Sequence, residues 1–329
     1  APLPAALVAM CGFFLTIPFS MHKDGTFWIP LDQLGSTGLF IAIIIGLFLT
    51  DLYVWMVHKK ITIKMPASVP PAVSDSFTAL FPGFFCLLLV WVIRMGVSFT
   101  PIETIPNLMQ FIFKPLSVVG TSLPGALICE FLVSFLWIFG IHGANVVSGV
   151  MTAIWLAAMQ QNAVAFTAHK ALPNIVTQQF FDNFVHIGGS GATLGLAIMM
   201  IMFAKSDEYK TLAKLEIAPA LFNINEPLVF GFPVVMNPFI AVPFIVAPLL
   251  NVLITYFAMA SGIVAKTIGI MVPWTTPAII SGYLATGHIS GAVLQVVLIA
   301  VDSLVYVYFF KKADKRKVQA QMANAKKAE

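Results

Sequence analysis

Apolar residues form long stretches along this chain, separated by short segments rich in polar residues, glycine and proline. A helix that crosses a bilayer needs about 20 consecutive apolar residues. Two of the stretches, 145–160 and 191–205, are short or interrupted, so the pattern predicts a range of about six to eight crossings. The apolar stretches are residues 4–20, 36–57, 76–99, 119–141, 145–160, 191–205, 228–260 and 288–310.

Helix-breaking residues interrupt the C-terminal apolar stretches. Proline inside a helix removes a backbone hydrogen bond and clashes with the preceding turn. Another uncharged run contains Pro-Trp-Thr-Thr-Pro at residues 273–277. Non-helical backbone at membrane depth is tolerated only inside protein or along a wet cavity, and broken helices mark substrate sites in transporters. The pattern therefore predicts broken or re-entrant segments around a polar site. The helix-breaking residues within 219–248 are Pro219, Pro227, Gly231, Pro233, Pro238, Pro243 and Pro248.

Residues 100–116 have a different pattern. Ile105, Met109, Phe113 and Leu116 follow near-helical spacing and are interspersed with polar residues. This pattern is typical of an amphipathic helix at the membrane interface. We expect it to link two halves of the molecule.

Composition supports a membrane protein. The 329 residues are 59% hydrophobic and 10% charged, with mean hydropathy +0.92, whereas a soluble domain is about a quarter charged. Cys11, Cys86 and Cys129 lie in apolar runs without CxxC spacing. Small buried hydrophobes are a better interpretation of these cysteines than disulfide or metal chemistry.

Basic residues predict the orientation in the membrane. The tail 311–329 carries seven lysines and arginines against one aspartate and one glutamate, and the segments 58–64 and 205–214 are also rich in lysine. Because cytoplasmic loops carry an excess of Lys and Arg, all three are expected to face the cytoplasm. We favour this topological role over nucleic-acid binding.

Glu226 is an isolated carboxylate, and no charged residue follows it until Lys266. An acidic residue inside a span costs about 2.5–3.5 kcal/mol on insertion scales. It could accept a hydrogen bond from a sugar hydroxyl, bind a proton or cation, or act as a base. It could also be a structural carboxylate held by backbone N–H groups at a wet helix end. The neighbouring Asn223, Asn225 and Pro227 favour a functional role, since a helix break exposes polar groups there.

His142 is a second candidate. It lies between Gly140 and Gly143 in a long stretch with few ionisable residues. A satisfied core histidine is the alternative, but the paired glycines favour a helix break or a close backbone approach. Trp137 precedes His142 by five residues, so the two rings converge only if the helix breaks near Gly140. Trp274, between two prolines, is a weaker candidate for the interfacial aromatic belt than Trp28, Trp55 and Trp91 are.

The segment 180–193 contains Asp182 and His186 at i,i+4 spacing, followed by Gly-Gly-Ser-Gly. The two side chains could pair on one helix face, but two ligands do not make a metal site, and we expect no metal and no cofactor. The glycine run lacks the lysine of a phosphate-binding loop. It is as consistent with a plain turn as with backbone that meets a polar ligand. There is also no GxSxG motif. Taken alone, the residues predict a transporter for a small polar solute, and an enzyme acting alone is disfavoured.

Four motifs occur in order: IHGAN at 141–145, IGGSGATLGL at 187–196, FNINEPLVFG at 222–231 and VPWTTP at 272–277. With ITIKMPASVPPAVSDSF at 61–77, they closely resemble the membrane-embedded IIC component of the bacterial phosphoenolpyruvate-dependent sugar phosphotransferase system, in its lactose, cellobiose and diacetylchitobiose group. The resemblance covers essentially the whole chain. Family members run about 100 residues further at the N-terminus, so we expect that segment to be missing here.

The resemblance implies an all-α integral membrane fold. A full family member would have about ten transmembrane helices with two re-entrant hairpins and would form a homodimer. Here, residues 180–191 and 222–231 would belong to the re-entrant pieces. The domains implied are the remainder of an interface domain (1–99), a linking helix (100–118), a substrate-binding transport domain (119–310) and a basic cytoplasmic tail (311–329).

The resemblance also implies a permease in the bacterial plasma membrane that binds a β-linked disaccharide of the cellobiose or diacetylchitobiose type. The sugar 6-hydroxyl would be phosphorylated by a phosphocysteine on a separate IIB protein, supplied through IIA and HPr. The chain would thus have no complete active site of its own. Glu226 would accept a hydrogen bond from that hydroxyl, and it would act either as an acceptor only or also as the general base that removes the proton. The alternative is a secondary transporter that couples uptake of a small polar solute to protons or sodium ions, with Glu226 as the ion site. The implied sugar-binding residues are His142, Glu226, Trp137, Trp274, Asn145, Asn225, Gly189 and Ser190.

Overall fold

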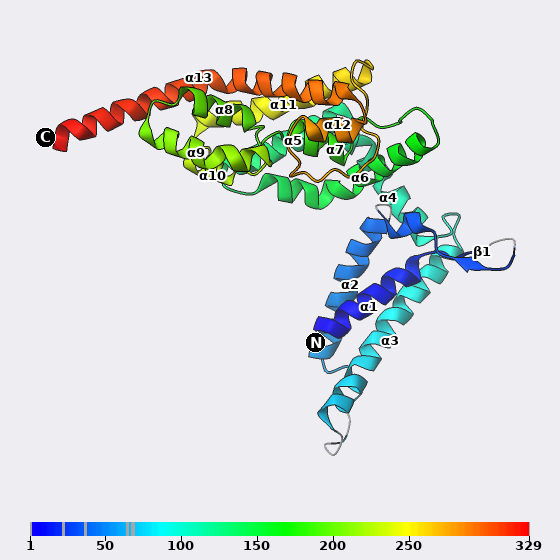
Figure 1. The fold of residues 1–329 in the computed structure, drawn as a ribbon. Coiled ribbons are helices and arrows are strands. Elements are labelled where there is room, and N and C mark those ends of the chain that lie inside the picture. Colours follow the sequence, from blue (N-terminus) through cyan, green and yellow to red (C-terminus); the bar gives the residue numbers. More distant parts are fainter. Residues whose placement is uncertain (1, 22–23, 36–37, 64–65, 67–69, 329) are drawn as a thin grey trace. The chain divides into compact units, whose positions relative to one another are not determined.

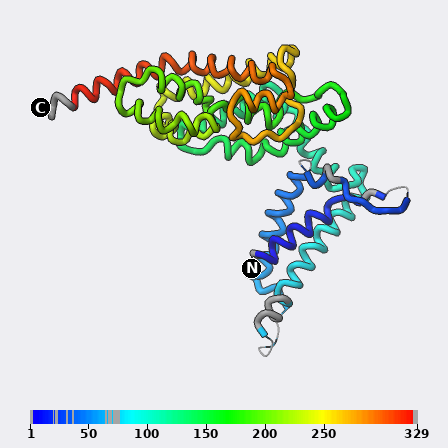
Figure 2. Tube along the Cα trace, viewed as in Figure 1, coloured from blue at the N-terminus to red at the C-terminus, as the bar shows by residue number. Residues whose placement is uncertain are grey.

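The computed structural model describes residues 2–21, 24–35, 38–63, 66 and 70–328 and is mainly helical (Figures 1 and 2). Part of the basic segment 58–64 and of the 61–77 motif lies outside the described residues. The chain forms two compact units, residues 1–116 and 117–329. The roles expected for domains 1–99, 100–118, 119–310 and 311–329 stay predictions.

The first unit packs three apolar helices around a small core. α1 (Pro2–Thr16) contacts both α2 (Leu39–His58) and α3 (Pro71–Ser98). A two-residue hairpin, β1 (Ser20–Met21) with β2 (Phe27–Trp28), and the short η1 (Leu31–Leu34) connect α1 to α2. α4 (Ile105–Gly120) is the helix expected around residues 100–116, and it begins five residues later and runs across the boundary between the units.

The second unit contains all the remaining elements. α11 packs against α5 and α13, and α8 packs against α9 and α13, so the long C-terminal helices form the frame that holds the shorter ones (Figure 1). Its elements are α5 (Leu123–Ile138), α6 (Gly143–Thr167), α7 (Gln178–Phe180), the π-helical η3 (Phe181–Val185), α8 (Leu194–Phe203), α9 (Asp207–Leu221), α10 (Glu226–Gly231), α11 (Pro238–Ala260), α12 (Ile280–Thr286) and α13 (Ile289–Ala328).

Among the described residues, five helices are long and apolar enough to span a bilayer, or six if α4 and α5, bent by 82° from each other, form one span. This confirms an all-α membrane fold. The stretches 4–20 and 191–205 form helices that are shorter than a full span. The five long spans are Leu39–His58, Phe77–Ser98, Gly143–Thr167, Pro238–Ala260 and Ile289–Asn324.

Prolines did not all break helices, contrary to the sequence-based expectation. Pro243 and Pro248 lie inside the continuous helix α11, where both are buried among neighbouring elements. Tertiary packing therefore compensates for the lost backbone hydrogen bonds there. The chain does break at 222–225 and at 232–237, on either side of α10, and residues 261–279 are largely irregular.

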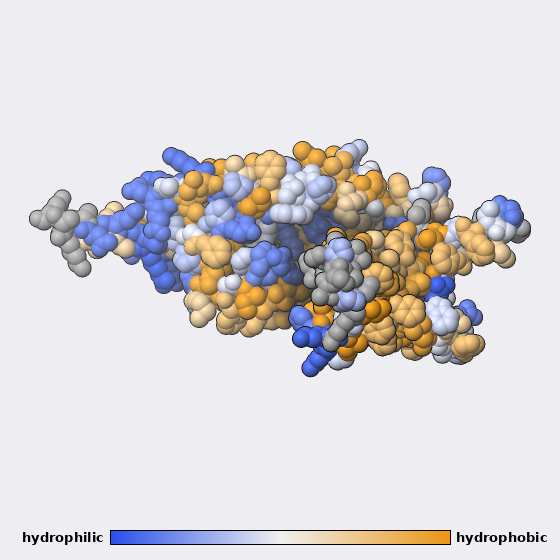
Figure 3. Space-filling model, turned by 90° about the horizontal axis from the view of Figure 1, so that it is seen from below, coloured by the Kyte–Doolittle hydropathy of each residue, from blue (hydrophilic) through white to orange (hydrophobic). Residues whose placement is uncertain are grey.

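The tail is a continuation of α13 rather than a separate element. The helix extends through the lysine-rich residues to Ala328, and Lys317 binds Glu208 of α9 at 2.8 Å. Figure 3 shows hydrophilic side chains gathered where the C-terminal part of α13 projects, and apolar side chains over much of the remaining visible surface.

Candidate functional site

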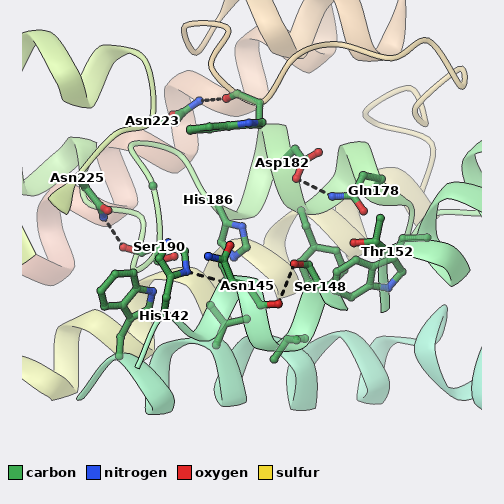
Figure 4. A pocket seen from close by; sticks show the side chains of 18 of the residues that line it. His142, Asn145, Ser148, Thr152, Gln178, Asp182, His186, Ser190, Asn223 and Asn225 are labelled. Carbon is green, nitrogen blue, oxygen red and sulfur yellow. Dashed lines mark hydrogen bonds between the residues drawn. The ribbon is translucent and has the colours of Figure 1, made fainter. Parts of the chain in front are cut away.

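A cavity of about 440 Å³ lies within the second unit. Helices α5, α6, α7 and α10, η3 and the irregular segments around them supply its lining (Figure 4). The cavity combines aromatic rings with amide, hydroxyl, imidazole and carboxylate groups. It brings together all eight residues singled out from the sequence, which are Trp137, His142, Asn145, Gly189, Ser190, Asn225, Glu226 and Trp274.

The turn between α5 and α6 places His142. The helix ends at Ile138 and Gly140 adopts φ +76°, a left-handed conformation that favours glycine. At Gly143 a Cβ atom would overlap the carbonyl oxygen of Val133, so only glycine allows α5 and α6 to approach this closely. Both interpretations of the paired glycines, a helix break and a close approach, are confirmed.

His142 caps the N-terminus of α6. Its Nδ1 accepts a hydrogen bond from the backbone N–H of Asn145 at 3.3 Å, so the neutral imidazole carries its proton on Nε2. That nitrogen lies 4.0 Å from Oε1 of Glu226. The imidazole also packs on Trp137, with ring centroids 4.5 Å apart. The break at Gly140 thus makes the two rings converge.

Glu226 is the first residue of α10, directly after the break that the sequence predicted there. Its side chain is 49% exposed and faces the cavity opposite His142. The carboxylate is therefore accessible to solvent and to a ligand. Its distance from Nε2 of His142 is too long for a hydrogen bond, so its oxygens remain free to accept one from a ligand.

Two buried amides before Glu226 fasten the irregular segments together. Asn225 donates through Nδ2 to the carbonyl oxygen of Ser190 at 2.7 Å and to the hydroxyl of Thr193 at 2.9 Å. Asn223 accepts from the Gly188 N–H at 2.6 Å and donates to the Trp274 carbonyl oxygen. Asn225 thus spends both N–H groups on a neighbouring loop, and its role as a sugar ligand stays a prediction.

The Gly-Gly-Ser-Gly run forms a tight turn against these amides. Gly188, Gly189 and Gly191 all have φ between +80° and +93°. A Cβ atom on Gly189 would overlap the side chain of Asn225, and one on Gly191 would overlap the ring of Phe244. The glycines are therefore required by the turn and by its packing, and the turn places the adjacent backbone along the cavity.

The two tryptophans differ in their surroundings. Trp137 is 2% exposed, and its indole Nε1 is buried without a hydrogen-bond partner among the described residues. Trp274 is 53% exposed. The Trp137 indole is thus packed inside the protein at the edge of the cavity, whereas the Trp274 indole is exposed to the cavity and to solvent.

The suggested pairing of Asp182 with His186 does not form. Gln178 donates to Asp182 at 2.9 Å, and Nε2 of His186 lies 2.6 Å from the buried Glu130 of α5. Ser134 donates to the other oxygen of Glu130. Burial raises the pKa of Asp182 to about 6, against the effects of Gln178 and His186. The partner of His186 is 56 residues away in sequence, although a glutamate within the apolar run 119–141 was itself a signal.

Glu216 was also missed by sequence reasoning. It lies on the buried face of α9 with Tyr209, Ala213 and Ala220, where an apolar residue would be expected. Burial and the nearby Glu226 raise the pKa of Glu216 to about 7. A charged residue on the apolar stripe of a helix could have indicated this position.

Comparisons with known proteins agree with these motifs. The family model "Phosphotransferase system, EIIC" matches residues 2–248. "Lichenan permease IIC component" of Bacillus subtilis (strain 168) is 47% identical, over 97% of this chain and 73% of that protein. "PTS system cellobiose-specific EIIC component" of Geobacillus stearothermophilus is 45% identical, over 98% of this chain and 74% of that protein.

A solved structure is similar over nearly the whole chain. It is the transporter ChbC, the IIC component from the N,N'-diacetylchitobiose-specific phosphotransferase system, with TM-score 0.90 and 45% identity over 96% of this chain and 76% of that chain. The family match begins at residue 2, so it does not confirm the expected absence of about 100 N-terminal residues. The chain belongs to the EIIC family of the phosphotransferase system, whose multi-pass membrane proteins act on a sugar together with a IIB protein.

Proposed function

We propose that the cavity binds a β-linked disaccharide of the cellobiose or diacetylchitobiose type and presents its 6-hydroxyl for phosphorylation. The observation that supports this most is the pairing, within one 440 Å³ cavity, of two indoles with a facing imidazole and carboxylate. Ligand pockets commonly have volumes of about 300–1,000 Å³. Two of the similar proteins described above are named as specific for cellobiose and for N,N'-diacetylchitobiose.

Sugars present flat C–H faces between polar hydroxyls, and the cavity offers surfaces for both. Trp137 and Trp274 supply aromatic surface to the cavity. Further along the cavity, Ser148, Thr152 and Gln178 add polar groups (Figure 4). Asn145, Asn225, Gly189 and Ser190 complete the proposed sugar-contacting set.

The proposed chemistry centres on Glu226 and His142. Glu226 accepts a hydrogen bond from the 6-hydroxyl, and the Nε2–H of His142 orients the same oxygen. That oxygen attacks the phosphorus of a phosphocysteine on IIB, the P–S bond breaks with its electrons on sulfur, and Glu226 takes the hydroxyl proton as a general base. Such a transfer depends mainly on positioning and charge stabilisation. Cys11, Cys86 and Cys129 are not among the described lining residues, which agrees with a donor on another protein.

The proposed assembly is a homodimer in the bacterial plasma membrane. Residues 1–99 form the dimer interface, 100–118 the linking helix and 119–310 the transport domain. The basic tail 311–329 lies in the cytoplasm, and IIA and HPr recharge IIB. Large apolar side chains exposed on α2 and α3, such as Leu47, Phe84 and Trp91, support an interface or a lipid-facing role for the first unit.

Glu226→Gln tests the proposed function. The isosteric amide keeps the shape but loses the charge-assisted hydrogen bond, worth about 1.5–3 kcal/mol, so sugar phosphorylation and cellobiose affinity are expected to fall about tenfold to a hundredfold. Thermal unfolding of the purified protein should be unchanged, and the exposed Glu103→Gln is the matched control. Unaltered uptake by Glu226→Gln would contradict the proposal.

A second measurement separates the proposal from ion-coupled transport. Uptake should require phosphoenolpyruvate and should yield intracellular sugar phosphate. Collapse of uptake by a protonophore while phosphoenolpyruvate is still present would instead support a proton-coupled transporter, with Glu226 as the ion site.

A further inference from the structure

Glu216 is a buried carboxyl directly behind the segment that presents Glu226. Its side chain is fully buried on α9, and neither carboxyl oxygen has a hydrogen-bond partner in the part of the chain that the structure describes. α10, which begins with Glu226, packs against α9. The carboxyl lies close enough to the first turn of α10 for the Glu226 carboxylate to raise its pKa and for the backbone N–H of Leu228 to lower it, although that N–H does not form a regular hydrogen bond with it.

Within the described part of the chain, α8 and α13, which also pack on α9, bring no charge to this carboxyl. α8 contains no ionisable residue. From α13, Asp314 accepts hydrogen bonds from the backbone N–H groups of Lys205 and Ser206, and Lys317 binds Glu208. Those groups lie at the opposite end of α9, two turns or more from Glu216. Glu226 is therefore the charged neighbour that matters.

Two facts favour the neutral form of Glu216. Burying an ionised carboxylate without a partner is costly, so such a group binds a proton instead. A second carboxylate close by opposes ionisation further, because two like charges in one site cannot both form cheaply. Consistent with this, the pKa of Glu216 is raised to about 7, mainly by burial and then by Glu226, against the smaller effect of the Leu228 backbone N–H, which lowers it. This carboxyl does not belong to a membrane-spanning helix, since α9 is not one of the apolar spans and begins with the charged residues Asp207 and Glu208.

We propose that Glu216 is a positioning residue for Glu226 and that it acts in its protonated form. As an uncharged carboxyl beside the first turn of α10, it leaves Glu226 as the single negative charge facing the sugar. When Glu216 loses its proton, the two carboxylates repel, Glu226 and the start of α10 are displaced, and the sugar is bound more weakly. The inference rests on the proposed function, because it assumes that Glu226 holds a sugar hydroxyl.

The test is the pH dependence of cellobiose binding to the purified full chain, measured by calorimetry. If only the protonated form binds well, the apparent Kd of the wild type should rise at least about tenfold between about pH 6 and about pH 9. Glu216→Gln mimics the protonated acid, so its Kd should stay within about threefold of the wild-type value at about pH 6 across the same range. Glu208→Gln makes the same change on an exposed part of α9 and should keep the wild-type profile.

A Glu216→Gln variant that keeps the wild-type pH profile would overturn the inference, as would a wild-type Kd that does not change with pH. Absence of cellobiose binding by the wild type at every pH would instead count against the proposed function. The titration can also be followed without ligand or substitution. In protein labelled with ¹³C-glutamate, the infrared C=O band of a protonated glutamic acid should be present at about pH 6 and should fade by about pH 9. Its absence at the lower pH would contradict a protonated Glu216 even if the variant failed to fold.

Discussion

Both units of the chain contain helices that are long and apolar enough to span a bilayer, but the units bury different groups. The first unit encloses a small core of Ala5, Ala9, Leu49, Tyr53, Cys86 and Val90. The second unit also buries carboxyl and amide side chains. Examples are Glu130, Glu216, Asn251 and Asp302, which are all fully buried. Apolar character is thus common to both units, whereas buried polarity separates them.

In the second unit, buried polar side chains and irregular backbone lower the stability of the fold but build the polar cavity. Burying a polar group costs free energy unless it is hydrogen-bonded, and irregular backbone at membrane depth must be buried in protein or line a wet cavity. The glycine turn at 188–191, the break before α10 and the irregular residues 261–279 meet around the cavity through Asn223 and Asn225. The first unit has no such network among its described residues. Substitutions of the same kind should therefore have different consequences in the two units.

The largest difference is expected for glycine. Gly143→Ala in the second unit forces a Cβ atom into the Val133 carbonyl, which should destabilise the protein by about 3 kcal/mol, the upper end for overpacking. It should also displace His142 and weaken cellobiose binding. Gly46→Ala in α2 meets no atom within 4 Å and should stabilise its helix by about 0.5–1 kcal/mol. Thermal unfolding of both variants measures the contrast, and two effects of the same sign would contradict it.

A smaller difference is expected for asparagine. Asn223→Ala leaves the Gly188 N–H and the Trp274 carbonyl without their partner and puts alanine at φ +61°. Each unsatisfied buried group costs about 1–3 kcal/mol, so we expect a loss of about 2 kcal/mol in unfolding free energy. Cellobiose binding should weaken as well, because the loops around the cavity come apart.

Asn107→Ala is the matched control in the first unit. Asn107 donates to the Ile102 carbonyl in an exposed loop, where water replaces the lost bond, so its unfolding free energy should change by less than about 0.5 kcal/mol. If Asn223→Ala proved as mild as Asn107→Ala, the amide network would not be what holds the cavity together.

Much of this arrangement could be predicted from local sequence. Apolar runs indicated the spans. The free-energy cost of placing a lone carboxylate, Glu226, in an apolar segment indicated a polar site. The glycines around His142 indicated the helix break that brings Trp137 against the imidazole ring. These signals work because a carboxylate or a helix break in an apolar setting is expensive at the level of single residues.

The remainder depends on contacts between distant segments. Pro243 and Pro248 were expected to break a helix, but they remain inside α11 because neighbouring elements pack around it. His186 pairs with Glu130 rather than with Asp182, since the π-helical turn and the packing of α5 decide the partner. Glu216 becomes informative only when α10 is seen to pack against α9. The local pattern of α9 marks Glu216 as an unusual residue on a buried face, but it does not show that Glu226 lies beside it.

The smallest expected effect concerns two buried threonines and separates polar groups that serve the structure from those that are only tolerated. The hydroxyl of Thr255 in α11 has no hydrogen-bond partner among the described residues, whereas Thr16 in the first unit donates to the Phe13 carbonyl at 2.6 Å. Thr255→Val removes an unsatisfied buried group of similar shape and should stabilise the protein by about 0.5–1 kcal/mol, with cellobiose affinity unchanged.

Thr16→Val should destabilise the protein by about the same amount, because it removes a hydrogen bond that is formed. Thermal unfolding of the two variants therefore gives shifts of opposite sign. A loss of stability in Thr255→Val would show that its hydroxyl is satisfied in the membrane, and that polarity in the second unit is structural even away from the cavity. A gain would confine the structural role to the amides and carboxyls whose partners are known, and would leave Thr255 as a polar group that the helix only tolerates.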